Sequence, residues 1–524
     1  MSSSTAQSSS PSRPLAQRIG AAVLDWVIRE RWLLVIFATA LLVRLHWNLE
    51  VHPPGDYVYS DMNGYVTRAD RMLKVGLEPH EYSSFFPYGT HWIVAGMKYT
   101  FGKDNFAAIG VLYALLGAFT VAFAFAAARR ACHFSWVPPA IGLLGVFYYP
   151  HISLGGYILS EVPFAFFLMG AVLFSLRMAD HGRARDAWVM GLFAGLGVVV
   201  RPQLLVSAAF LGLFWIVQRK ALSKIRLVHL LQSFVPVLIL LALSTALLKH
   251  NTGRYGLVSE NGSFNLVFGR CHNSKIRSTP DGKGHGRVHF RPPSFLQITN
   301  HEARARKRGI PPRVALEPAL DNELVYPGYI GDSKKHMEYI RECIRRTGWL
   351  GQLRYSVVNA TLLWRHNVPW PDSGRTQWRE VSRDWTKWHR NLFAIPALLG
   401  LLILVPWPNS LRERWKETFA GWVENWTRKP RWQRHMFGVL LITWLLQFIL
   451  GRRSARQGLL AIHLLASLLV AAVFFGSIRV RTPYDFIIIT LALEVFAFGL
   501  WSIYRAIRWI GWDRRRARDE TPGE

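Results

Sequence analysis

The chain has 524 residues, of which 51% are hydrophobic, and its formal net charge is +30. The apolar residues are gathered in runs, and several runs reach the length of about 20 residues that a helix needs to cross a bilayer. This pattern predicts an integral membrane protein. Cytoplasmic loops of such proteins carry an excess of Lys and Arg, so the positive charge does not indicate a nucleic-acid partner, and none is expected.

The first 249 residues are predicted to hold seven membrane spans. Residues 1–31 are interpreted as a cytoplasmic tail with an amphipathic lead-in, because Arg29 and Arg31 directly precede the first apolar run. Residues 32–249 form the predicted transmembrane catalytic core, and residues 48–104 form its first outer loop. The predicted spans are about Trp32–Trp47, Phe106–Ala128, Trp136–Tyr149, Tyr157–Met178, Ala187–Val200, Leu204–Val217 and Val228–Leu248.

Residues 250–390 are polar and contain many Gly and Pro, which predicts an extracytoplasmic loop domain of mixed structure with a helix at Asp332–Arg346. An oxidising compartment would permit a disulfide between Cys271 and Cys343, although the sequence does not show whether they lie close enough. A zinc site is an alternative, and a Gly-rich loop with scattered His is another. The residues with a spacing that suits zinc are Cys271, His272, His285 and His289.

Residues 391–510 are predicted to hold the C-terminal membrane helices. The apolar runs are about Leu392–Trp407, Met436–Leu450, Leu459–Phe475 and Phe486–Ile503. Four crossings would leave the tail at residues 511–524 outside, whereas its arginines indicate the cytoplasm, so Met436–Leu450 is predicted not to cross fully. The expected fold is an all-α polytopic membrane protein with about ten (roughly nine to twelve) transmembrane helices and both ends inside.

The first outer loop contains an amphipathic stretch, Ser60–Leu73, which is predicted to be a helix at the membrane surface with Ser60 as its N-cap. One face carries Asp61, Tyr65 and Arg68. Another, apolar face consists of Met62, Val66, Ala69 and Leu73. A carboxylate at the mouth of a membrane protein indicates a site, but Asp in a first helical turn also simply complements the helix dipole.

Other charged residues break the charge bias on the predicted outer side: Glu161 begins an apolar run, and Arg201, Arg479 and Arg481 lie where cations are not favoured. Arginine suits the recognition of phosphate, and a carboxylate can take a proton from an acceptor hydroxyl. Together they predict a transfer reaction from a phosphate-bearing lipid, with arginines or a metal stabilising the leaving phosphate. The alternative for the arginines is that they reach lipid headgroups by snorkelling.

The order of motifs along the chain resembles a known family. The motifs are SDMNGYVTRADRML, FFPYGTHW, ILSEVPFAFFL, GLGVVVRPQLL, SENGSFNLVFGR and RVRTPY, which occur in this order between Trp32 and Ile503. The chain is similar to the polytopic, GT-C type glycosyltransferases that use polyprenyl-phosphate sugars, a superfamily that includes protein O-mannosyltransferases and lipid A aminoarabinose transferases. Two positions depart from it: Asp485 stands where similar sequences often carry Pro, and Met62 follows Asp61 in place of a paired Asp-Glu.

The resemblance implies roles for these residues. Asp61 would be the general base, and Glu161 would be a second acid that in some relatives contacts a metal. Arg479 and Arg481 would face the lipid phosphate. Independently of the resemblance, Tyr65 and Arg201 are predicted to bind substrate, because of their place at the predicted outer mouth. No organic cofactor is implied, whereas a divalent metal is allowed, with Asp61 and Glu161 as its candidate ligands.

The resemblance also implies an inverting transfer from a polyprenyl-phosphate sugar to a lipid, glycan or protein acceptor, at the extracytoplasmic side of a bacterial-type inner (plasma) membrane. Met62 argues against protein as the acceptor. One alternative is a transporter or flippase of an anionic lipid or lipid-linked sugar. Such proteins more often show inverted repeats and helix breaks at matching places in two halves. In this sequence only one break is evident, at Arg201-Pro202. Another is a binding subunit without catalysis, against which Asp61 and Glu161 argue.

Overall fold

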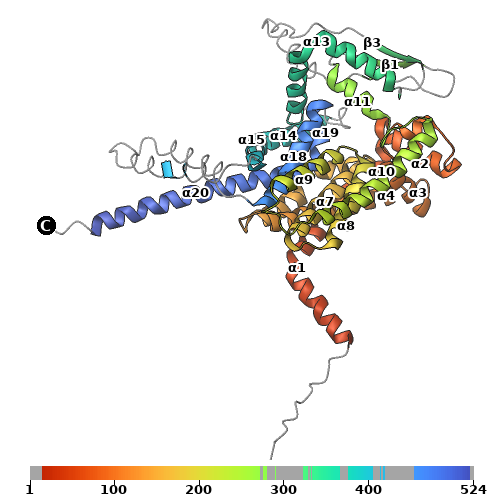
Figure 1. The fold of residues 1–524 in the computed structure, drawn as a ribbon. Coiled ribbons are helices and arrows are strands. Elements are labelled where there is room, and N and C mark those ends of the chain that lie inside the picture. The colour runs from red at the N-terminus through yellow and green to blue at the C-terminus, as the bar shows by residue number, and fades with distance from the viewer. Residues whose placement is uncertain are drawn as a thin grey trace, which may run out of the picture.

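The computed structural model describes residues 15–271, 275–279, 289–290, 323–327, 333–365, 376–404 and 454–519, together with a few isolated positions. In this part of the chain almost all secondary structure is helical (Figure 1). The predicted run Met436–Leu450 and the last three residues of the predicted run Leu392–Trp407 lie outside the described residues.

The N-terminal half forms a helical bundle. Its long helices are α1 (Leu15–His46), α4 (Phe106–Ala131), α7 (Glu161–His181), α8 (Ala184–Val200), α9 (Leu204–Val217) and α10 (Leu227–Thr252), and the shorter α5 (Val137–Phe147) follows α4. Figure 1 shows α4, α7, α8 and α10 side by side, which buries the small residues that face one another along them. Each predicted span up to Leu248 therefore corresponds to a helix.

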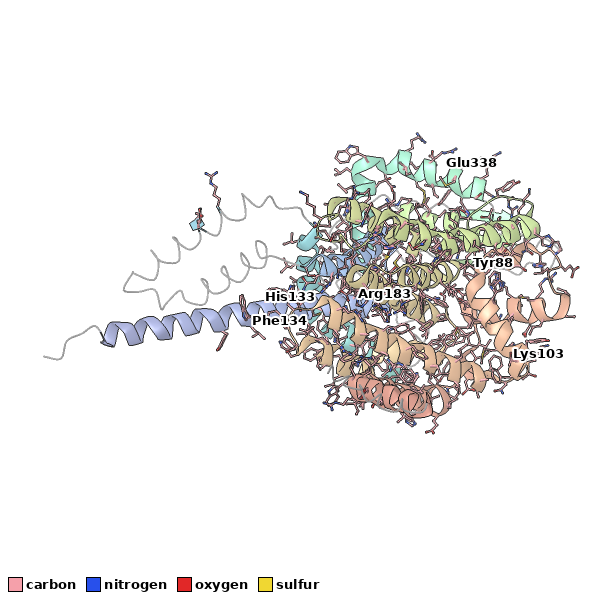
Figure 2. The ribbon with its side chains drawn as sticks, turned by 60° about the horizontal axis from the view of Figure 1, so that its bottom comes forward. Tyr88, Lys103, His133, Phe134, Arg183 and Glu338 are labelled. Carbon is pink, nitrogen blue, oxygen red and sulfur yellow. A yellow bond between two sulfur atoms is a disulfide. The ribbon has the colours of Figure 1, made fainter. Side chains whose placement is uncertain are left out.

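Short helices fill the loops between these long ones. The loop after α1 contains η1 (Trp47–Val51), η2 (Pro54–Tyr57), α2 (Ser60–Val75), η3 (Glu81–Ser84) and α3 (Tyr88–Phe101). The connection from α5 to α7 contains α6 (Tyr149–Ser153) and η4 (Leu154–Gly156). Figure 2 shows Lys103 and His133, which flank α4, at opposite ends of the bundle, with Tyr88 at the Lys103 end. The loop that carries α2 and α3 thus lies at one end of the bundle.

The C-terminal part adds further helices to the bundle. They are α14 (Thr376–His389), η6 (Arg390–Ala394), α15 (Ile395–Gly400), η7 (Leu401–Leu404), α18 (Ala455–Val473), α19 (Ile478–Arg481), η9 (Thr482–Tyr484) and α20 (Asp485–Asp519). Figure 1 shows α20 projecting away from the bundle beyond its packed first half.

Six helices in the described residues are long and apolar enough to cross a membrane. They are Val27–Val51, Phe106–Ala131, Glu161–His181, Leu227–Thr252, Ala455–Val473 and Ile478–Trp501, and the apolar helices Val137–Phe147 and Leu204–Val217 are shorter. The multi-pass, helical architecture is thus confirmed. The count of about ten spans stays a prediction, because several of the predicted runs form helices of fewer than 18 residues or lie outside the described residues.

A module follows α10 and lies at the edge of the structure in Figure 1, and we call it the outer module for that place. It comprises α11 (Asn261–Arg270), a small sheet and the long α13 (Ser333–Leu362). The sheet has the order β2-β1-β3: β1 (Lys275–Thr279) pairs antiparallel with β2 (His289–Phe290) and parallel with β3 (Glu323–Pro327). The helix predicted at Asp332–Arg346 is confirmed, and α13 continues past it through a kink at Gly348, whose φ of 65° is one that glycine adopts easily.

A disulfide between Cys271 and Cys343 joins the end of α11 to α13, with the two Cα atoms 5.5 Å apart. This confirms the pairing that the sequence left open. It also makes the zinc hypothesis wrong for Cys271, because a sulfur in a disulfide is not available as a thiolate ligand. His272 and His285 lie outside the described residues.

Candidate active site

Asp61 lies in the first turn of α2, but Ser60 does not cap this helix as predicted. The N-cap is Tyr59, no side chain makes a capping hydrogen bond, and Ser60 has a φ of 51°. A non-glycine residue in this left-handed region is uncommon, so the chain turns sharply just before Asp61. This turn orients the first turn of α2, and with it the Asp61 carboxylate, toward α19.

The α2 helix is buried on more than its apolar face. Met62, Val66 and Ala69 are buried as predicted, whereas Leu73 is 40% exposed. Tyr65 and Arg68, which were expected on the polar face that carries Asp61, are buried too. Arg68 donates from Nε to the Tyr82 carbonyl at 2.5 Å and from Nη1 to the Gly64 carbonyl at 2.7 Å. The helix is therefore fixed between the bundle and the following loop instead of lying free on a surface.

Glu161 begins α7 and its side chain is fully buried. One of its oxygens, Oε1, accepts hydrogen bonds from Nη2 of Arg201 and from Nε of Arg479. Arg201 follows the last residue of α8, and its Nε donates to the Ser160 hydroxyl at 2.8 Å. A buried carboxylate without a partner would be strongly unfavourable, so the two guanidinium groups stabilise the ionised Glu161.

Arg479 connects Glu161 to Asp61. Its Nη1 donates to Oδ2 of Asp61 at 2.7 Å, across a separation of 418 residues in the sequence. The Asp61 side chain is 29% exposed, whereas Glu161 is fully buried. We call Asp61, Glu161, Arg201 and Arg479 the four-charge cluster: two carboxylates and two guanidiniums from four separate segments, with the accessible carboxylate at one end.

Tyr65 lies beside this cluster. Burial raises the pKa of its phenol, and the negative charge of Asp61 raises it further, so the group stays protonated and can donate a hydrogen bond. Ser160 is hydrogen-bonded both to Tyr65 and to Arg201. Sequence reasoning missed Ser160, although its place immediately before Glu161 in the quoted LSEVP run was a signal.

Five of the six predicted site residues therefore come together, and Arg481 does not. Its guanidinium is fully buried and donates from Nε to Oδ1 of Asp485 at 2.8 Å and from Nη1 to the Leu363 carbonyl at 3.1 Å. The i to i+4 spacing places Asp485 directly beside Arg481. The unusual Asp485 thus has a structural account as the partner of a buried arginine.

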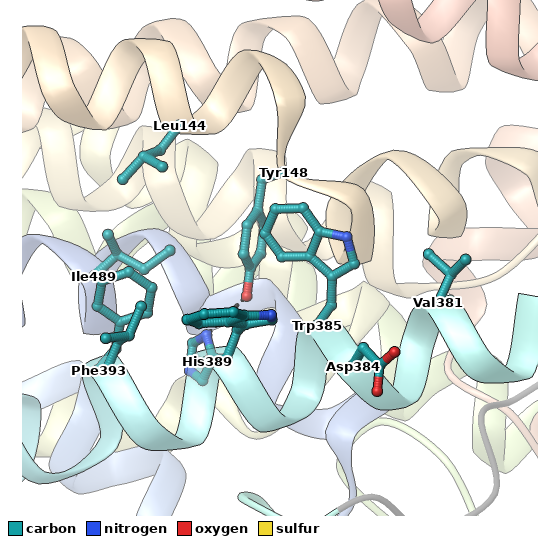
Figure 3. A pocket seen from close by; sticks show the side chains of 10 residues that line it. Leu144, Tyr148, Val381, Asp384, Trp385, His389, Phe393 and Ile489 are labelled. Atoms are coloured by element: carbon teal, nitrogen blue, oxygen red, sulfur yellow. Dashed lines mark hydrogen bonds between the residues drawn. The ribbon is translucent and has the colours of Figure 1, made fainter.

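Asp485 also belongs to a cluster of hydrogen-bonded polar side chains, two of which line an apolar cavity. Tyr148 donates to Oδ2 of Asp485 at 2.8 Å and contacts Nδ1 of His389 at 2.7 Å. Figure 3 shows Tyr148 and His389 at the cavity of about 500 Å³, with Trp385, Phe393, Leu144 and Ile489 around them. None of the residues that line this cavity belongs to the four-charge cluster.

The geometry does not suit a metal ion shared by Asp61 and Glu161. Arg479 contacts both carboxylates, so its guanidinium occupies the position that a bridging cation would take. Among the residues that the structure describes, no group of three or more His, Cys, Asp or Glu side chains is placed to hold a metal. The positive charge at this site comes from arginines.

Comparison with known proteins gives one match. Residues 31–249 match the family model described as dolichyl-phosphate-mannose-protein mannosyltransferase. A search of curated proteins gave no match, nor did a search of solved structures. The matched segment supplies Asp61, Glu161 and Arg201, whereas Arg479 comes from the part of the chain that follows it.

Proposed function

We propose that the chain is a polytopic glycosyltransferase of the GT-C type, which transfers a sugar from a polyprenyl-phosphate donor to an extracytoplasmic acceptor. The match of residues 31–249 to the mannosyltransferase family model supports this proposal. The chain is a multi-pass membrane protein. The observation that carries the proposal is the four-charge cluster, in which the accessible Asp61 carboxylate pairs with Arg479, and the buried Glu161 carboxylate pairs with both Arg479 and Arg201.

Asp61 is the general base in this proposal. As a carboxylate it can accept a proton, and its partial exposure leaves it open to an acceptor hydroxyl. Glu161 is unsuited to that role, because its Oε1 is already used by two guanidinium groups and its side chain is fully buried. Its role is to position Arg201 and Arg479.

The proposed step is a single displacement at the anomeric carbon of the sugar. The acceptor oxygen forms a bond to this carbon while the bond from the carbon to the phosphate oxygen breaks. The acceptor proton moves to Asp61, and polyprenyl phosphate leaves with the electron pair of the broken bond. Attack opposite to the leaving group inverts the configuration at that carbon.

Arg201 and Arg479 stabilise the leaving group. The phosphate gains negative charge as its bond to the sugar breaks, so fixed positive charges interact with it more strongly in the transition state than in the bound donor. The cluster is partly shielded from solvent, with the Arg201 side chain 15% and the Arg479 side chain 20% exposed. Shielding strengthens these interactions relative to water. Tyr65 supplies a hydrogen-bond donor for the sugar or the phosphate.

We further propose that the site faces the extracytoplasmic side of the inner (plasma) membrane, in a chain with about ten spans and both ends inside. The charge bias along the first seven apolar runs supports this arrangement. The disulfide of the outer module supports it as well, since disulfides persist in oxidising compartments. The predicted loop domain at residues 250–390, which contains the outer module, would then help to select the acceptor, which is a lipid, glycan or protein.

A direct test uses purified protein in lipid nanodiscs with a radiolabelled polyprenyl-phosphate sugar and cell-envelope extracts as acceptors. Polyprenyl-phosphate mannose is the first donor to test, because the matched family is described by that substrate. We expect label to move to an acceptor and the anomeric configuration to invert. Unchanged donor across a panel of such sugars, with folded protein, would contradict the proposal.

A further inference from the structure

Arg479 lies in α19, a helix of only four residues, so something outside this helix must hold it in place. The chain reaches α19 through residues 472–477, which are the last two residues of α18 and the four-residue loop that follows it. The outer module contacts this loop through α11 and α13, and we call residues 472–477 the docking loop.

Close backbone contacts seat the docking loop against the module. A Cβ atom added to Gly269 of α11 would overlap the carbonyl oxygen of Phe474, and one added to Gly476 would overlap the carbonyl oxygen of Asn359. Arg270 donates to the carbonyl of Ala472. Such approaches are open only to glycine, so both sides of the contact are built for close packing.

Asn359 lies at the centre of this contact and is fully buried. Its Nδ2 donates to the Gly269 carbonyl at 3.1 Å and to the Phe474 carbonyl at 3.4 Å. One amide group thus joins α11, α13 and the docking loop. Buried carbonyl groups need such donors, because a buried carbonyl without one loses its hydrogen bonds to water and gains none in return.

The same end of α13 also holds the far side of α19. The carbonyl of Leu363, four residues after Asn359, accepts from Nη1 of Arg481. The last turn of α13 therefore contacts the chain on both sides of Arg479. At the near side, Ser477 caps α19 by accepting from the Val480 N–H at 3.2 Å.

We propose that Asn359 is a positioning residue for Arg479: it docks the outer module on the docking loop and so holds the Arg479 guanidinium between Asp61 and Glu161. The role of Arg479 in catalysis rests on the proposed function, whereas the docking itself does not. The outer module is in this way a structural part of the active site and not only a surface for the acceptor.

The test substitutes Asn359→Asp, which keeps the size of the side chain but turns oxygen atoms toward two carbonyl oxygens. Gly476→Ala disturbs the same contact from the other side. Asn251→Asp is the matched control. Its amide donates to the Leu247 carbonyl at 2.9 Å and to the Tyr88 hydroxyl at 3.2 Å and accepts from the His80 N–H at 3.0 Å, and none of these partners belongs to α19 or the docking loop. Thermal unfolding of each full-length variant in nanodiscs establishes that it is folded.

Two readouts are needed. Hydrogen exchange of the peptide covering residues 474–481 reports on the loop without any substrate. Turnover of polyprenyl-phosphate mannose, or of the sugar donor identified by the panel above, is measured for Asn359→Asp, Arg479→Lys and the double variant. A misplacement of about 1 Å at a reacting group can cost about 100-fold in rate, so we expect a loss of this order for Asn359→Asp.

If Asn359 acts through Arg479, residues 474–481 exchange faster in Asn359→Asp and Gly476→Ala but not in Asn251→Asp. The losses in turnover are then not additive, and Asn359→Asp adds little to Arg479→Lys. Unchanged exchange of residues 474–481 overturns the inference, as do fully additive losses. Wild-type turnover in Arg479→Lys would instead contradict the proposed function, and the exchange data would then decide the docking by themselves.

Discussion

Replacing Glu161 by Gln tests how the four-charge cluster is held together. Gln keeps the shape of the side chain and one acceptor oxygen, but it removes the negative charge that both guanidinium groups face. Arg479 would keep Asp61 as a charged partner, whereas Arg201 would be left with neutral acceptors, the amide oxygen and the Ser160 hydroxyl. Breaking a buried ion pair in this way costs about 3–5 kcal/mol in the free energy of unfolding.

The upper part of this range is expected, because the Glu161 side chain is fully buried and Arg201 is 15% exposed. Unfolding in mixed micelles, followed by circular dichroism, measures the loss. The matched control is Asp384→Asn, whose pair with Lys387 is about half exposed on both sides, so that its loss should stay below about 1 kcal/mol. Equal stability of the Glu161→Gln and Asp384→Asn variants would refute the reasoning.

Three further predictions concern other parts of the molecule. Replacing Cys271 and Cys343 by Ser should destabilise the outer module by about 4 kcal/mol, because the bridge closes a sequence separation of 72 residues, and faster proteolysis of that module would show it. Arg481→Leu should lower the melting temperature, because it leaves the buried Asp485 without its charged partner. The Kd of polyprenyl phosphate should stay unchanged in the folded variant. A tenfold weaker Kd at unchanged stability would mean that Arg481 binds the donor. Burial and then Arg68 lower the pKa of His91 to about 3, so the unfolded chain binds a proton below pH 6.5 that the folded chain does not. The free energy of unfolding should fall as the pH drops from 6.5 to 5, with a slope that approaches about 1.4 kcal/mol per pH unit at the acid end. The slope should be smaller in His91→Gln, and equal slopes would count against this account.

Much of the bundle could be predicted from sequence because apolar runs and charge bias are local signals. The helices from α1 to α10 follow the predicted spans closely, since an uninterrupted apolar segment has few alternatives in a bilayer. The charges of Glu161, Arg201 and Arg479 stood out for the same reason: an ionisable group beside an apolar run needs a partner.

The partners themselves could not be predicted. Arg479 and Arg481 are two residues apart and have the same chemistry, yet one contacts Asp61 and the other Asp485. Which arginine faces the site depends on the direction of a four-residue helix, and that is set by the docking of α13 far away in the sequence. The prediction that Ser60 caps α2 was wrong. It rested on residue type alone, since serine suits an N-cap, whereas the backbone turns sharply at Ser60.

The outer module shows the same limit. The Cys271–Cys343 pair was open in the sequence, because residue separation says nothing of distance in the fold. The importance of Asn359 had no sequence signal at all, since one buried amide in a polar helix resembles any other.

The central claim is that Asp61 is the general base, and the substitution Asp61→Asn tests it most directly. Asp70→Asn on the same helix is the control, since Asp70 pairs with Lys98 at 2.7 Å, away from the four-charge cluster. Both variants are compared in nanodiscs for turnover of the labelled sugar donor and for the Kd of polyprenyl phosphate. We expect turnover of Asp61→Asn to fall at least about 100-fold with little change in Kd, while Asp70→Asn keeps its turnover. Turnover of Asp61→Asn close to that of the wild type would contradict the claim.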